Sequence, residues 1–201
     1  MTATHENPKT SIEHLHVVRS GIFRSVRRYW LEGEFFCWSD ADGQNAQSVS
    51  LADVSSLRIQ SRTAGMQSQA LCYLTEKSGR RHLITDLHWQ SRAERKESAG
   101  ARHALRSLSY WELVSTIIRR LRLANPDALY LKGPSKIEWI STIVVAIASV
   151  LIVVIGLYLM ISEQTYPFHV IGFIAMAAVY LPLLWPTIES GGPKPFDPES
   201  I

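Results

Sequence analysis

The feature that most constrains this chain is a long apolar run without charge. Residues 139–161, WISTIVVAIASVLIVVIGLYLMI, hold 23 positions in succession with no Asp, Glu, Lys or Arg. As an α-helix this run would extend about 35 Å, and the hydrocarbon core of a bilayer is about 30 Å thick. The sequence therefore predicts a membrane-spanning helix at this place.

A second apolar run follows closely. Residues 168–188, FHVIGFIAMAAVYLPLLWPTI, also carry no charge, and only residues 162–167 separate the two runs. Such a short connection favours two antiparallel helices, so we predict a two-helix transmembrane hairpin. Pro182 and Pro186 are expected to kink or end the second helix near Trp185.

Basic residues gather before the first run, and the connection between the runs has Glu163 but no Lys or Arg. Because positively charged flanks stay in the cytoplasm, we predict a multi-pass protein of the bacterial inner (plasma) membrane with both termini cytoplasmic. The chain also holds these basic residues close to the bilayer, so they are candidates for contact with lipid headgroups. They are Arg119, Arg120, Arg122, Lys132 and Lys136.

The two apolar runs carry no ionisable residue within their cores, and His169 lies at an edge. Transport of ions usually leaves such residues inside the membrane, so the pattern favours anchoring. A seam of small residues on the first run indicates close helix packing, within the hairpin or with a second copy. The seam consists of Thr142, Ala146, Ser149 and Gly156.

The polar part of the chain is basic: residues 1–136 hold 20 Lys and Arg against 13 Asp and Glu. Short aromatic and β-branched segments alternate with turn residues between about 23 and 86, which predicts a small antiparallel β-sandwich or barrel. Its core is expected to take five aromatic side chains. These are Tyr29, Trp30, Phe35, Phe36 and Trp38.

A charged segment, residues 90–104, is predicted to be a loop, and an amphipathic helix is predicted after it. Ser109 and Glu112 have capping-box spacing, and Asn125 with Pro126 is expected to end the helix. The apolar stripe of this helix is expected to close the sandwich. It consists of Tyr110, Leu113, Val114, Ile117, Ile118 and Leu121.

Four segments in this order, YWLEGEFFCW, SLADVSSLRI, GRRHLITDLHW and YWELVSTIIRRL, resemble the pleckstrin-homology-like (PH-like) domains of small bacterial membrane proteins. The resemblance covers about residues 20–124. It implies an α+β fold, a small antiparallel sandwich capped by a C-terminal helix, often beside a pair of membrane helices. The lipid pocket of the wider fold is not carried over, because its first loop here holds Glu32 and Glu34.

The predicted organisation has seven parts in order. They are an N-terminal segment (1–19), a PH-like cytoplasmic domain (20–124), a juxtamembrane linker (125–138), a first transmembrane helix (139–161), an external loop (162–167), a second transmembrane helix (168–188) and a cytoplasmic tail (189–201). The tail is rich in Gly and Pro and is expected to be extended. Its PKPFDP stretch is either a docking peptide or a plain end.

No pattern for catalysis, a cofactor or nucleic-acid reading is found. His14 and His16 are a poor start for a metal site because no third ligand has suitable spacing. Cys37 and Cys72 are expected to be reduced and mostly buried. A further basic group is a candidate surface for anionic lipid, with a solvated strand face as the alternative. It consists of Arg24, Arg27 and Arg28.

The sequence thus predicts a non-enzymatic interaction or scaffolding module, held at the inner membrane to bind a protein partner or a complex. Membrane lipid and a protein partner or second copy are the expected partners, without nucleic acid, metal or cofactor. The alternative is a regulatory subunit of an oligomeric channel or transporter, and a membrane enzyme is a third reading.

Overall fold

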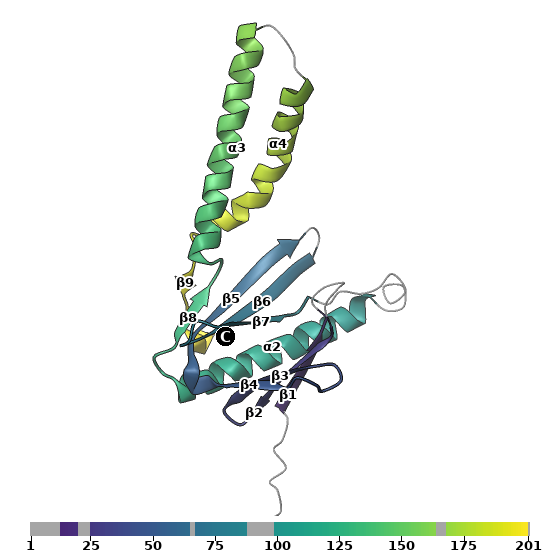
Figure 1. The fold of residues 1–201 in the computed structure, drawn as a ribbon, viewed down its shortest axis with the longest axis vertical. Helices are drawn as coiled ribbons and strands as arrows, with labels where there is room; N and C mark the ends of the chain where they lie inside the picture. The colour runs from purple at the N-terminus through teal and green to yellow at the C-terminus, as the bar shows by residue number, and fades with distance from the viewer. Residues whose placement is uncertain (1–12, 20–24, 65–66, 88–98, 164–167, 201) are drawn as a thin grey trace, which may run out of the picture. The chain divides into compact units, whose positions relative to one another are not determined.

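The computed structural model describes residues 13–19, 25–64, 67–87, 99–163 and 168–200. The chain divides into two compact units. Unit 1 combines Met1–Leu131 with Pro195–Ile201, and unit 2 is Lys132–Lys194. The class is α+β, with two antiparallel sheets and long helices (Figure 1).

The first sheet, sheet A, has four strands in sequential order: β1 (Glu13–Val18), β2 (Arg27–Glu32), β3 (Phe35–Asp40) and β4 (Gln47–Ser50). A two-residue turn joins β2 to β3, and its Gly33 has a φ of 58°, a conformation that suits glycine. Because β1 begins at Glu13, the folded domain starts earlier than the predicted boundary at residue 20.

The second sheet, sheet B, follows a short 3-10 turn, η1 (Leu51–Asp53). Its strand order is β7-β6-β5-β8-β9. The strands are β5 (Val54–Ala64), β6 (Gln67–Glu76), β7 (Arg81–Thr85), β8 (Leu129–Lys132) and β9 (Lys194–Pro195). The predicted linker therefore contains a strand, β8, and the predicted extended tail contains another, β9.

Helix α2 (Ala99–Ala124) packs against the core of unit 1, and all six residues of its predicted stripe are buried. Its start was predicted wrongly. The helix begins at Ala99, within the segment expected to be a loop, because Ala, Arg and Leu, all good helix formers, continue the pattern upstream. Ser109 lies inside the helix, where its hydroxyl bonds His16 instead of capping an end.

The aromatic core of sheet A is smaller than predicted. Tyr29, Phe36 and Trp38 are buried, and Phe36 stacks on Tyr29 with ring centroids 6.0 Å apart. Trp30 and Phe35 occupy the alternate positions and point to the other face, where Phe35 is 49% exposed. The prediction that these two rings belong to the core is wrong, because successive strand residues alternate between faces.

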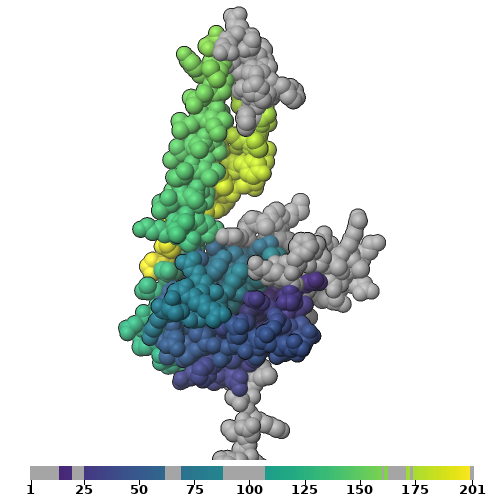
Figure 2. All heavy atoms as spheres, in the orientation of Figure 1, coloured from purple at the N-terminus to yellow at the C-terminus, as the bar shows by residue number. Residues whose placement is uncertain are grey.

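Unit 2 is a pair of helices, α3 (Lys136–Glu163) and α4 (Phe168–Glu189), which lie side by side (Figure 1; Figure 2). Helix α4 continues through Pro182 and Pro186 to Glu189, so of the two predicted effects, a kink or an end near Trp185, the end does not occur. At the foot of the pair, Trp139 Nε1 donates a hydrogen bond to the Ile188 carbonyl at 3.1 Å.

Among the described residues, only α3 has the length and hydropathy of a membrane-spanning helix. Its apolar part is Lys136–Leu159. The most apolar 18-residue window of this stretch has a mean hydropathy of 2.9, and only 6% of that window is buried. The corresponding described stretch of α4, Ile174–Glu189, is shorter than a span requires. By length and composition, one candidate span is therefore found among the described residues where two were predicted.

After α4 the chain returns to unit 1 through residues 195–200, which we call the return segment. Phe196 packs against the core and meets the Tyr130 ring edge-on at 6.0 Å. Its backbone N–H donates to the Tyr130 carbonyl at 3.1 Å, and the segment ends in a 3-10 turn, η2 (Pro198–Ser200). The tail is therefore extended at β9, as expected, but it ends in a 3-10 turn and Phe196 anchors it to the core of unit 1.

Candidate functional site

The basic residues at the end of α2 are used largely within unit 1. Arg120 Nη1 donates to the Gly33 carbonyl in the β2–β3 turn. Arg122 pairs with Glu199 of the return segment, and Arg119 Nη2 donates to Thr116 Oγ1 at 3.5 Å. Arg120 and Arg122 therefore connect α2 to the β2–β3 turn and to the return segment. The sequence positions of these arginines do not indicate such contacts.

A groove of about 420 Å³ lies between α2 and the return segment. Its lining combines two arginines with apolar side chains and one carboxylate: Ser115, Ile118, Arg119, Arg122, Leu123, Pro198 and Glu199. Leu123 is 82% exposed on its rim. Since Glu199 already neutralises Arg122, the groove offers an anion less positive charge than the sequence indicates.

The other predicted lipid-facing residues lie apart. Lys132 in β8 and Lys136 in the first turn of α3 are exposed. Arg24 lies outside the described residues. Arg27 and Arg28 are exposed neighbours in β2 and point to opposite faces, so they do not form one surface.

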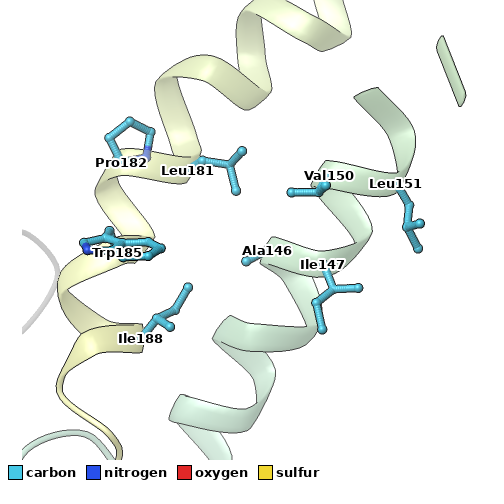
Figure 3. Close-up of a pocket in the computed structure, with 8 residues that line it drawn as sticks. All are labelled: Ala146, Ile147, Val150, Leu151, Leu181, Pro182, Trp185 and Ile188. Carbon is cyan, nitrogen blue, oxygen red and sulfur yellow. The ribbon is translucent and has the colours of Figure 1, made fainter. Parts of the chain in front are cut away.

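The predicted small-residue seam of α3 lies partly against α4. Ala146 and Gly156 are buried, whereas Thr142 and Ser149 are partly exposed and bond carbonyls of their own helix. Ala146 also lines an apolar groove of about 610 Å³ between the helices (Figure 3). The other lining residues are Ile147, Val150, Leu151, Leu181, Pro182, Trp185 and Ile188.

His16 is a core residue. Its Nε2 donates to the Thr85 carbonyl and its Nδ1 accepts from the Ser109 hydroxyl, each at 2.9 Å. His14 is exposed, with a φ of 53° beside an irregularity in β1. The structure therefore does not bring these two histidines together, and the described residues contain no group of three metal-ligating side chains.

A polar pair that sequence reasoning missed lies where sheets A and B meet. His82 Nε2 and Glu76 Oε1 are 2.6 Å apart, and the imidazole packs on the Trp38 ring at 4.4 Å. Ser78 donates a second hydrogen bond to Glu76, at 2.7 Å. These hydrogen bonds, with that from His82 the larger cause, lower the pKa of the Glu76 carboxyl from its usual value.

Replacing Glu76 by Gln is expected to reduce the loss of stability in acid. A lowered pKa means that the unfolded chain binds this proton more tightly, so stability present above the unfolded-state pKa is lost as pH falls through the folded-state pKa. Urea unfolding of the full chain in detergent at pH 7 and about pH 4 measures the effect. Glu34→Gln, in an exposed turn, is the control, and equal pH dependence in both variants would contradict this role.

Cys37 and Cys72 are buried free thiols, as predicted. Burial, with a smaller contribution from Glu32, raises the pKa of Cys37 to about 11, and burial raises that of Cys72 to about 12. Neither thiol is therefore an activated nucleophile at neutral pH.

The outer face of sheet A carries a groove of about 360 Å³, which we call the outer groove. It combines two aromatic rings and one carboxylate with part of strand β4, and its described lining contains no basic side chain. The residues are Trp30, Glu32, Phe35, Cys37, Ala46, Gln47 and Ser48. Leu15 and Val17 of β1 are also exposed on this face, so it is apolar in a place where water-facing strands are usually polar.

Comparison with known proteins gives no family for this chain: no family model matches it, and no curated protein is significantly similar to it. The candidate sites therefore depend on their own geometry.

The outer groove had a signal in the sequence. In YWLEGEFFCW, strict alternation around the Gly33 turn places Tyr29 and Leu31 on one face and Trp30 and Glu32 on the other. A count of the aromatic residues alone does not show this alternation between the two faces. The His82–Glu76 pair had no such signal, because it depends on how the turn between β6 and β7 is folded.

Proposed function

We propose that unit 1 is a non-enzymatic interaction module that α3 and α4 hold at a membrane, where it binds a partner protein. The observation that carries the proposal is the return of the chain to unit 1 after the two apolar helices. The localisation that we propose is the inner membrane of a bacterium, with unit 1 in the cytoplasm.

The return segment restricts how the chain crosses a bilayer. Leu131 and Pro195 belong to the same compact unit, so the chain leaves and re-enters unit 1 on one side of the membrane. The number of crossings between them must therefore be even. If α3 crosses the bilayer, the chain has to cross back before Pro195. This requirement favours α4 as the second helix of a transmembrane hairpin, although the described apolar stretch of α4 is short.

The surface of α3 also supports insertion. Large apolar side chains such as Val145, Ile152 and Ile155 are at least half exposed in the helix pair. Removing a fully exposed side chain of this kind from water is worth about 1.5–3 kcal/mol, so removing the exposed half is worth roughly half as much. Many such side chains on one helix make lipid a far better surrounding than water.

The order of elements in unit 1 supports a PH-like domain. A sheet of four sequential strands precedes three further antiparallel strands, and a long amphipathic helix then closes the core. Because Cys37 and Cys72 have raised pKa values and Glu76 is bound to His82, the chemistry of these groups favours binding over catalysis. Lys132 and Lys136 remain the residues that we propose for headgroup contact.

Site-specific thiol labelling in cells tests the arrangement. The native cysteines are buried, so a cysteine introduced at exposed Ser78 or Ser162 reports its own side of the membrane. We expect Ser162→Cys to react with a membrane-impermeant maleimide in spheroplasts, and Ser78→Cys to react only after permeabilisation. Reaction of both in intact spheroplasts, or extraction of the chain by alkaline carbonate, would contradict the proposal.

Binding of a partner is tested separately. The full chain, tagged in unit 1 and expressed at its native level, is crosslinked in intact cells before solubilisation. We expect a discrete heteromeric product that is lost when cells express the tagged α3–α4 segment without unit 1. Recovery of the bare chain alone would remove the interaction function while leaving the membrane anchor.

A further inference from the structure

We propose that the outer groove receives a guanidinium or ammonium group from an extended segment of the partner protein, which pairs along strand β4. The inference rests on the proposed function, since it names the chemistry of the partner that unit 1 would bind. Charge, aromatic surface and an open strand edge each contribute to it.

The charge of the groove selects a cation. Glu32 is partly buried, and its contact within the described structure is the Cys37 thiol at 4.0 Å, too weak to offset a carboxylate's loss of water. Among the residues that the structure describes, no Lys, Arg or His lines the groove. An incoming cation would therefore find a carboxylate oxygen for which the described part of the domain supplies no cationic partner.

The aromatic side chains select a cation that also carries apolar surface. Trp30 and Phe35 line the same groove as Glu32, and Phe35 is 49% exposed. The face of an aromatic ring attracts a Lys or Arg side chain within about 6 Å of its centroid, most strongly for Trp. The methylene stem of such a side chain would cover the two rings while its charged end reaches Glu32.

The edge of sheet A supplies the backbone partner. Strand β4 is outermost in the order β1-β2-β3-β4, and its residues Gln47–Ser50 show no backbone hydrogen bond among the described residues on the side away from β3. It has no Lys or Pro, the residues that usually prevent edge pairing. An extended peptide can therefore add as a fifth strand beside the groove.

The inner face of this edge is already engaged. Arg80 Nη2 donates to Gln47 Oε1 at 2.9 Å and lies over the Trp38 ring at 5.8 Å. Gln47 pairs with Trp38 in the sheet, so these two side chains lie on the same face of the sheet, although Gln47 also lines the outer groove at the edge of the sheet. Arg80 thus fixes the position of β4 without supplying the cation that Glu32 lacks.

The same charge argues against a membrane as the occupant. Anionic headgroups would meet Glu32 in the groove and Glu34 in the adjoining turn, and like charges repel. We therefore assign the outer groove to a protein segment and leave headgroup contact to the exposed lysines Lys132 and Lys136.

The test uses the full chain in phosphatidylcholine nanodiscs and fluorescence anisotropy. The probe is a labelled alternating valine–serine peptide with one central arginine, and the matched peptide carries neutral citrulline in its place. We expect saturable binding of the arginine peptide and at least about tenfold weaker binding of the citrulline peptide, as losing a charge-assisted hydrogen bond and a cation–π contact implies.

Two isosteric variants locate the site. Glu32→Gln is expected to weaken the arginine peptide at least about fivefold, whereas Glu34→Gln, two residues away in the exposed turn, should leave its Kd unchanged. Near-ultraviolet circular dichroism confirms that each variant is folded. Phe35→Leu, which keeps apolar volume but removes the ring, should fall between them.

Three outcomes would overturn the inference: no binding of the arginine peptide, equal binding of the citrulline peptide, or equal Kd values for Glu32→Gln and the unchanged chain. Self-association that Glu32→Gln abolishes would also overturn it, because the occupant would then be a second copy. If the peptides fail while crosslinking in cells still yields a heteromeric product, only the groove assignment is lost, and the proposed function stands.

Discussion

His16→Ala should destabilise unit 1 by about 3–4 kcal/mol, the largest effect that we expect from a single polar residue. His16 has no exposed surface, and it links three elements: it belongs to β1, donates to the Thr85 carbonyl at the end of β7, and accepts from Ser109 in α2. Its ring also meets Tyr110 edge-on at 5.9 Å. Alanine removes two hydrogen bonds and leaves a cavity among these elements.

Two further variants separate the loss of the His16 hydrogen bonds from the loss of its packing. His16→Phe keeps a ring of similar size but no hydrogen-bonding atoms, so it should recover part of the loss. His14→Asn, two positions away, is exposed and keeps a residue that tolerates positive φ, so its effect should stay within about 0.5 kcal/mol. Urea unfolding of the full chain in detergent measures all three, and equal midpoints for His16→Ala and His14→Asn would contradict the assignment.

Asn125→Ala should cost about 2–3 kcal/mol, because one side chain serves two purposes there. Its Nδ2 donates to the Val54 carbonyl at 2.8 Å in the interior, at the start of β5. Its Oδ1 accepts from the Asp127 backbone N–H at 3.3 Å, just past the end of α2. The substitution leaves a buried carbonyl without this donor and loosens the turn from α2 into β8.

Asn125→Asp distinguishes these two purposes. Aspartate can still accept from Asp127 N–H but has no donor for the Val54 carbonyl, so we expect it to destabilise at least as much as alanine. If the side chain only ended the helix, aspartate would instead be tolerated well. Asp127→Ala, at an exposed position, is the control and should change the unfolding free energy by less than about 0.5 kcal/mol.

Local patterns predicted the regular elements well. Alternation and turn residues located the strands between Arg27 and Thr85, and the 3.6-residue stripe of α2 identified six buried positions. The apolar run of α3 was equally clear. In each case the signal lies within one element, where periodicity and burial have the same cause.

The failures concern contacts between distant segments. No local pattern indicates that β8 and β9 extend sheet B, since both are short and follow helices. Arg122 resembled a residue for lipid headgroups until Glu199 was placed beside it, 77 positions along the chain. The contacts of Arg120 and Arg122 within unit 1, and the groove that the alternation of Trp30 and Phe35 forms on the outer face, thus become visible only when distant segments are placed together.

The return segment also sets an order of events during synthesis. Residues 195–200 are made after both apolar helices, yet they supply Phe196 to the core of a domain whose other strands precede those helices. Sheet B therefore gains its last strand only after the ribosome has finished the segments destined for lipid. If the insertion machinery misplaces the helices, Phe196 cannot reach Tyr130. Tyr130 and its neighbours would then stay exposed, and proteases would cleave the incompletely folded domain.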